Sequence, residues 1–357
     1  MGSCYPSDSR ALAVLKAFES DIRAFVPSSD QSKLSAASWW LRRSAARPPR
    51  GPDAWWPTEV ELNALTQRLH ARVTGGGRSG GRKRRTAVRL AVGHLRVLLR
   101  DLLLVASGLR ASCLVDCCAL TTELAERLLQ SLAGESLHWC AMDQVRAVLL
   151  DGNVFFVNAD AFVREKMAGL ATGLDGQMYV DVSASLRHPQ VIRKVSRLQT
   201  LGAWTVKACK DLLAADKRGV LEWKRPSTLN ATALAGILLC YPFVYDISAD
   251  GTEPSDGWSE QENCLALCPL VVVRTAVMTS RQLELVLQEF SAPQHLLEDF
   301  NEHGETSDQV VHSPLVKHLR ACCRLKLQRA IERSAFSCCS VQPQVQVDTR
   351  SLPRVAL

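Results

Sequence analysis

The sequence predicts an α/β protein in which a mixed β-sheet is covered by helices and preceded by a flexible basic N-terminal arm. Short apolar runs rich in β-branched residues alternate with segments of helical period, as expected where helices cover a sheet. Hairpin-like pairs of runs at residues 145–158 and 265–287 make part of the sheet antiparallel. We therefore expect residues 1–86 to be a poorly ordered arm and residues 87–357 to form a single α/β domain.

The composition of the N-terminal segment predicts the arm. Gly, Ser, Pro and Arg are dense in residues 47–52 and 75–85, and such segments cannot bury an apolar core. Residues 10–25 are compatible with one amphipathic helix. The tryptophan pairs Trp39-Trp40 and Trp55-Trp56 would either anchor a protein partner or pack back onto the domain.

Charge is concentrated in the arm. Residues 1–90 hold 16 Lys and Arg against 7 Asp and Glu, whereas the rest of the chain holds 27 against 29. A near-neutral domain argues against a nucleic-acid-binding groove, which needs clustered cations. Nucleic-acid contact is therefore expected only through Arg82, Lys83, Arg84 and Arg85, a run that also fits a solvated linker or a nuclear address.

The first half of the domain is predicted to contain two helices before a hairpin. Leucines at helical spacing predict a helix over residues 86–106, and Thr121 or Thr122 caps another that runs to Ala133. Short strands are expected at 112–116 and 137–142.

A hairpin is predicted around Asp151-Gly152-Asn153, because this turn sequence separates two apolar runs, 145–150 and 154–158. The next expected elements are a helix over 160–170, a strand over 178–183, a long helix from Pro189 to about 214, and a linker through Pro226.

The longest apolar stretch, residues 231–287, is predicted to form the spine of the sheet. A helix capped by Thr228 or Asn230 ends at Tyr241-Pro242, and a strand follows over 243–247. Residues 265–277 are apolar on both faces, which is typical of a central strand, with Pro269 at a bulge or an end. Residues 283–287 alternate and predict a half-exposed strand, and the polar segment 248–262 predicts a loop.

The C-terminal segment is predicted to hold one helix and one strand. Ser313 and Pro314 begin a basic amphipathic helix with Leu315, Leu319, Cys322, Leu325 and Ile331 facing inward and Lys326 among the cations facing outward. Its charged face is either solvated or in contact with an acidic partner or a membrane surface. The alternating tail from Val341 is expected to be an edge strand of this chain's own sheet, with pairing to a partner's sheet as the alternative.

Several blocks resemble a known family. The blocks Gly236-Ile-Leu-Leu-Cys-Tyr-Pro-Phe-Val-Tyr245 and Asn263-Cys-Leu-Ala-Leu267 resemble the uncharacterised vertebrate family named after human chromosome 1 open reading frame 74. The resemblance covers roughly Leu95 to Pro293 and the tail from Leu352. It implies no activity, cofactor or substrate, and family members tend to have Gly where this chain has Cys240.

The cysteines and the hydropathy of the chain limit the cellular compartments in which we expect the protein. The 13 cysteines are odd in number and include no C-x-x-C pair, which favours a reducing compartment, cytoplasm or nucleus. No segment is apolar enough to span a membrane. No cofactor or metal site is expected, since phosphate-loop and dinucleotide motifs are absent and Cys264-x3-Cys268, the nearest fit to zinc spacing, equally suits a core strand.

Two aspartates follow predicted strands and are candidate catalytic residues. Asp116 and Asp181 end their strands, and ligands of open α/β sheets bind at such ends. Carboxylates there would act as acid and base, with His188 just downstream of Asp181. The alternative is that each carboxylate caps the following turn.

A thiol nucleophile is the second candidate. Cys264 follows Asn263 at the start of an apolar strand, but a catalytic thiol needs a nearby base, and no spacing pairs a histidine with it. His138 is interpreted as a core histidine.

The sequence thus favours an interaction protein of unknown function with a possible protein partner, because no complete catalytic set accompanies the basic arm, the tryptophan pairs and the apolar tail. The alternative is a hydrolase or transferase with a site near Asp116 and Asp181. A third hypothesis is nucleic-acid binding through residues 78–89.

Overall fold

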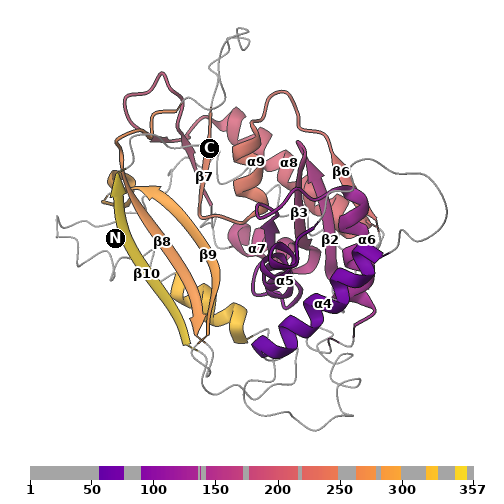
Figure 1. Cartoon of the computed structure of the whole chain (residues 1–357). Coiled ribbons are helices and arrows are strands. Elements are labelled where there is room, and N and C mark those ends of the chain that lie inside the picture. The colour runs from indigo at the N-terminus through magenta and orange to yellow at the C-terminus, as the bar shows by residue number, and fades with distance from the viewer. Residues whose placement is uncertain are drawn as a thin grey trace.

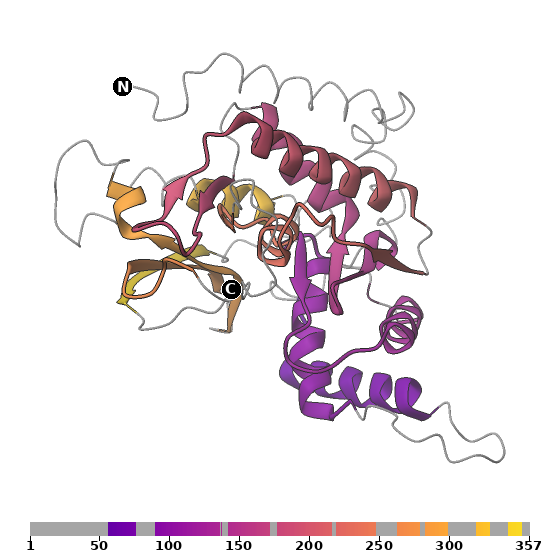
Figure 2. The same ribbon diagram turned by 90° about the horizontal axis from the view of Figure 1, so that it is seen from above.

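The computed structural model describes residues 56–75, 90–135, 137, 142–171, 177–215, 219–247, 263–278, 283–298, 319–328 and 342–351. Helices gather around one sheet, and another sheet, made of the three long strands β8, β9 and β10, lies beside them (Figure 1). The same two parts are seen from above in Figure 2. The predicted α/β class with mixed sheets is confirmed. The helix over 10–25, the basic run 82–85, His138 and the loop 248–262 lie outside the described residues.

Three helices pack together at the N-terminal side: α4 (Glu59–Gly75), α5 (Val92–Ala106) and α6 (Thr122–Ala133). Helices α5 and α6 confirm two predictions, although α5 begins at Val92. Helix α4 lies within the range predicted to be a poorly ordered arm. It is ordered because its leucines are buried against α5 and α6, and because Glu59 pairs with Arg96 and Arg100.

The first sheet has four strands in the order β1-β3-β2-β6. Its members are β1 (Ser112–Leu114), β2 (Val145–Leu150), β3 (Asn153–Asn158) and β6 (Val220–Trp223). The predicted hairpin is confirmed, with positive φ at both Asp151 and Gly152, as a type I′ turn requires. Strand β6 was predicted to be a linker. It forms because it pairs in parallel with β2, a contact across about 70 residues that local pattern does not encode.

The second sheet has the order β5-β4-β7 and consists of β4 (Met178–Asp181), β5 (Gln190–Val191) and β7 (Phe243–Asp246). Strands β4 and β7 run parallel. Helices α7 (Ala159–Ala171) and α8 (Val195–Ala214) precede and follow β4 and β5, and α9 (Ala231–Leu238) precedes β7. The prediction that Pro189 opens the long helix is wrong, because the next residues pair with β4 as β5.

The third sheet is antiparallel, with the order β10-β8-β9. It comprises β8 (Pro269–Met278), β9 (Glu284–Pro293) and β10 (Gln342–Ser351), and α10 (Gln294–Glu298) follows β9. Strand β8 is central, as its apolar character predicted, with Pro269 at its first position. Strand β10 pairs with β8 over ten residues, which confirms that the tail is an edge strand of the chain's own sheet.

The single spine predicted for residues 231–287 is divided between two sheets. Strand β7 belongs with β4, and β8 belongs with β9 and β10. A strand was predicted over residues 137–142. The last of these residues, Met142, begins a 3-10 helix over Met142–Gln144.

Residues 319–328 form a helical segment whose buried side differs from the prediction. Leu319, Cys323 and Leu327 are buried, whereas Leu325 is 46% exposed. Lys326 was expected to face solvent, but its ammonium lies 2.8 Å from the Glu165 carboxylate of α7. Burial opposes the charge, yet this carboxylate raises the pKa of Lys326 above its usual value. Within the described residues no helix could cross a membrane.

Candidate functional site

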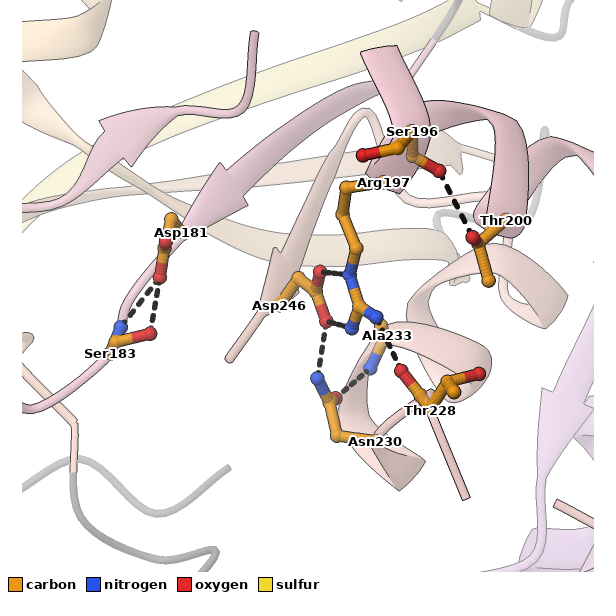
Figure 3. Close-up of polar contacts among 9 residues, drawn as sticks. All are labelled: Asp181, Ser183, Ser196, Arg197, Thr200, Thr228, Asn230, Ala233 and Asp246. Carbon is orange, nitrogen blue, oxygen red and sulfur yellow. Dashed lines mark hydrogen bonds and ion pairs between the residues drawn. The ribbon is translucent and has the colours of Figure 1, made fainter. Parts of the chain in front are cut away.

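Two aspartates lie side by side at the carboxyl ends of the parallel strands β4 and β7. Asp181 and Asp246 are register partners, and both are labelled in Figure 3. In α/β proteins this edge of a parallel pair is where ligands bind. The two side chains differ in burial, since Asp246 is fully buried and Asp181 is partly exposed.

Asp246 is enclosed by side chains from α8 and α9. The Arg197 guanidinium donates two hydrogen bonds of 2.6 Å to its carboxylate, and the Asn230 amide donates another (Figure 3). Asn230 also caps α9, because its side-chain oxygen accepts from the Ala233 N–H at 2.7 Å. Arg197 donates further to the Thr228 carbonyl. A buried carboxylate with this many charge-assisted bonds is a structural clamp between β7 and two helices.

Asp181 forms a local turn. One of its oxygens accepts from the Ser183 N–H at 2.9 Å and from the Ser183 hydroxyl at 2.5 Å (Figure 3). This is the turn-capping alternative of the sequence analysis.

Asn263 and Cys264 lie next to this turn. Asn263 forms an isolated antiparallel bridge with Ser183, and the Cys264 N–H donates to the Val182 carbonyl at 3.0 Å. The Asn263 side-chain oxygen accepts from the Leu265 N–H. Burial, with the Asp181 charge adding to it, raises the pKa of the Cys264 thiol to about 11. The thiol is therefore protonated at neutral pH, which is the reverse of what a thiol nucleophile needs.

The remaining candidates lie elsewhere. His188 is exposed, and its ring packs edge-on against His295 with centroids 6.3 Å apart. Asp116 is exposed beyond β1, in a different sheet from Asp181. Burial raises the pKa of Asp101 despite its ion pair with Arg110, and the nearby Asp116 charge adds to this rise. The structure thus brings Asp181, Asn263 and Cys264 together and leaves Asp116 apart.

Among the described residues, no three His, Cys, Asp or Glu side chains gather so as to hold a metal ion. Nine cysteines of this part form no disulfide bond in the structure. Burial raises the pKa of Cys113, Cys118, Cys209 and Cys240 to about 12.

The end of α9 is held by side chains from distant parts of the chain. The Lys166 ammonium donates to the Ile237 carbonyl at 2.7 Å, and the Ser112 hydroxyl donates to the Leu238 carbonyl at 2.5 Å. The Gln177 amide donates to the Tyr241 carbonyl and the Gln288 amide to the Cys240 carbonyl, both at 2.9 Å. These bonds satisfy helix-end carbonyls that would otherwise lack a donor.

Cys240 occupies the left-handed position of this helix end, with φ of 54°. The Tyr241 N–H donates to the Gly236 carbonyl and the Cys240 N–H to the Ile237 carbonyl, which is a Schellman motif. Glycine is the usual residue here, so the tight turn that the resemblance left open is present with cysteine in its place.

Beyond this turn, a cavity of about 400 Å³ lies between α9 and the third sheet. Its aromatic lining comes from Tyr241, Phe243, Tyr245 and Phe290. The Phe243 and Phe290 rings stack with centroids 6.2 Å apart, and Tyr241 lies 6.3 Å from Phe290. Its other lining residues are Thr232, Ala235, Gly236, Leu239, Leu270, Val272, Glu289, Ser291 and Arg350.

None of the five predicted candidates lines this cavity. Asp246 was not among the predicted candidates, although it is the last residue of β7 just as Asp181 is the last residue of β4. The cavity was not predicted either, although Tyr241, Phe243 and Tyr245 alternate along the sequence that lines it.

Comparisons with known proteins give one match. Residues 81–314 match the model of a family described as "Domain of unknown function (DUF4504)", and the resembling blocks between Leu95 and Pro293 lie within that range. No curated protein and no solved structure matches the chain.

Proposed function

Because the chain belongs to the family described as Domain of unknown function DUF4504, which has no assigned activity, we propose a function from geometry. The protein is a non-enzymatic binding protein, and its binding site is the cavity between α9 and the β10-β8-β9 sheet. The observation that carries this proposal is an aromatic-lined space of about 400 Å³. This size lies within the range of pockets that bind small molecules, which are mostly apolar with a few polar groups.

The rigidity of one wall supports this proposal. Tyr241 and Phe243 directly follow the α9 turn, whose carbonyls are bound by Ser112, Lys166 and Gln177. A lining held by satisfied hydrogen bonds loses little freedom when a ligand binds, which favours affinity.

The candidate catalytic residues give the enzyme alternative little support. The Asp181 carboxylate is engaged by Ser183, the Cys264 thiol is protonated, and Asp116 belongs to a different sheet. The hydrolase or transferase near Asp116 and Asp181 stays a hypothesis without a shared site.

The free thiols support a cytoplasmic or nuclear location, since such thiols persist in reducing compartments. A fluorescent fusion that enters the secretory route would contradict this part of the proposal.

Ligand screening of the full chain tests the cavity. Small aromatic and apolar compounds are expected to raise the thermal unfolding midpoint, because ligands that bind the native state stabilise it. The Ala235→Leu substitution fills the cavity and should abolish the shifts, while Ala203→Leu on the exposed side of α8 should not. Val272→Phe is the second filling variant if Ala235→Leu unfolds. Hits that stabilise filled and control variants equally would refute the cavity as the site.

A further inference from the structure

We propose that the cavity selects an organic ammonium cation, a quaternary or methylated amine; this inference rests on the proposed function and names its ligand class. The first supporting feature is the lining of four aromatic rings, since ring faces attract cations. The centroid of the Phe290 ring lies 6.2 Å from that of Phe243 and 6.3 Å from that of Tyr241, so three of these rings lie close together.

The second feature is an imbalance of charge at the rim. Glu289 and Arg350 are the two charged lining residues. The Arg350 guanidinium is bound by Asp348 at 2.8 Å, so its charge is locally compensated. The nearest cation to Glu289 in an ion pair is Arg274 at 3.9 Å.

Arg274 itself is engaged more closely elsewhere, because it lies 2.7 Å from Glu284. Among the described residues of this face of the sheet, two arginines therefore accompany three acids, and the ion pair of Glu289 is the longest of the three. A ligand that brings a positive charge to the rim would neutralise the remaining negative charge, whereas an anion would be repelled by Glu289.

The third feature concerns the shape of the cation. A primary ammonium is strongly hydrated and requires hydrogen-bond acceptors, whereas a methylated ammonium presents apolar surface to rings. The lining contributes Leu239, Leu270 and Val272 besides the rings, which suits methyl groups. A free choline-like molecule and a trimethylated lysine side chain share this head group.

The test compares choline with its neutral isostere 3,3-dimethylbutan-1-ol, using the full chain and calorimetric or thermal-shift titration. Choline is expected to bind at least about fivefold more tightly than the isostere, the ratio that one modest cation–π contact supplies. Glu289→Gln should reduce this preference, because the charge is lost while the rings stay, and the matched control Glu222→Gln at an exposed position of β6 should keep it in full. Affinity should fall as ionic strength rises.

A third ligand separates the two sources. A peptide with trimethyl-lysine that binds more tightly than choline, and more tightly than its unmethylated form, would assign the site to a protein partner. Equal binding of choline and the isostere would overturn the cation proposal while leaving the cavity as a binding site. If neither choline nor its isostere binds, and no compound in the small-molecule screen shifts the unfolding midpoint, both the cation proposal and the cavity proposal are overturned.

Discussion

The guanidinium of Arg197 holds the carboxylate of Asp246 through two hydrogen bonds, each of 2.6 Å, at the point where β7 ends. Arg197 lies in the first turn of α8, 49 residues earlier in the chain. The pair thus fixes the second sheet to α8, and Asn230 extends the same contact to the start of α9.

Replacing Arg197 by Met should destabilise the fold by about 3 kcal/mol, because the Asp246 carboxylate would stay buried without its cation. The free energy of unfolding from denaturant titration measures this. Lys207→Met breaks the exposed pair with Asp211 and should cost under about 1 kcal/mol. Equal losses in the two variants would show that the clamp does not carry the stability assigned to it.

Leu267 has a φ of 59° and is 73% exposed, so its backbone is strained without compensating burial. Leu267→Gly should raise the free energy of unfolding by about 0.5–1 kcal/mol, since glycine adopts this conformation at no steric cost. Leu267→Ala keeps the β-carbon and should give no gain. Stabilisation by alanine as large as by glycine would mean that the exposed side chain, rather than the backbone, is responsible.

Glycines at positions 93 and 236 should respond oppositely to alanine. A β-carbon at Gly236 would meet the buried Val244 side chain at 3.3 Å, and this crowding should outweigh the gain in helix propensity, so Gly236→Ala should destabilise the fold. Gly93 is exposed in the first turn of α5 with nothing within 4 Å, so Gly93→Ala should stabilise by up to about 1 kcal/mol through helix propensity. Thermal unfolding of both variants measures the signs, and a stabilised Gly236→Ala would disprove the close packing of α9 on β7.

The fold should weaken in alkali through its buried thiols. Burial raises the pKa of Cys209 to about 12, whereas an exposed thiol has a value near 9. The unfolded state therefore loses its proton first, and stability present below pH 9 declines between pH 9 and 12. Cys209→Ala removes this contribution and should flatten the decline by about 1 kcal/mol per pH unit. Denaturant titrations at pH 7, 9 and 10 measure the free energy of unfolding of the wild-type chain and of Cys209→Ala. The same pH dependence in both proteins would contradict the prediction.

Local signals predicted the elements that local chemistry determines. The hairpin followed from Asp151-Gly152-Asn153, and α6 from its Thr121 cap, whose oxygen accepts from the Leu124 N–H. The capping box of Thr58 and Glu61 was an equally local signal for α4, but the surrounding Gly- and Arg-rich composition outweighed it.

Elements stabilised by distant contacts were not predictable in this way. Strand β6 is short and is held by its pairing with β2. Lys326 pairs with Glu165 of α7 and does not face solvent. The clamp on Asp246 is of the same kind, because nothing in the spacing of Arg197 and Asp246 indicates that they meet. The cavity likewise combines residues of five elements that are separate in sequence, α9, β7, β8, β9 and β10.

Strand β10 lies outside the range that the family model matches. The matched range ends at residue 314, yet ten residues of β8 find their partners between 342 and 351. The matched range also begins after α4, which covers leucines of α5. A fragment of residues 81–314 would leave one edge of β8 unpaired and the apolar face of α5 without α4. Such a fragment should self-associate, so its properties would differ from those of the full chain.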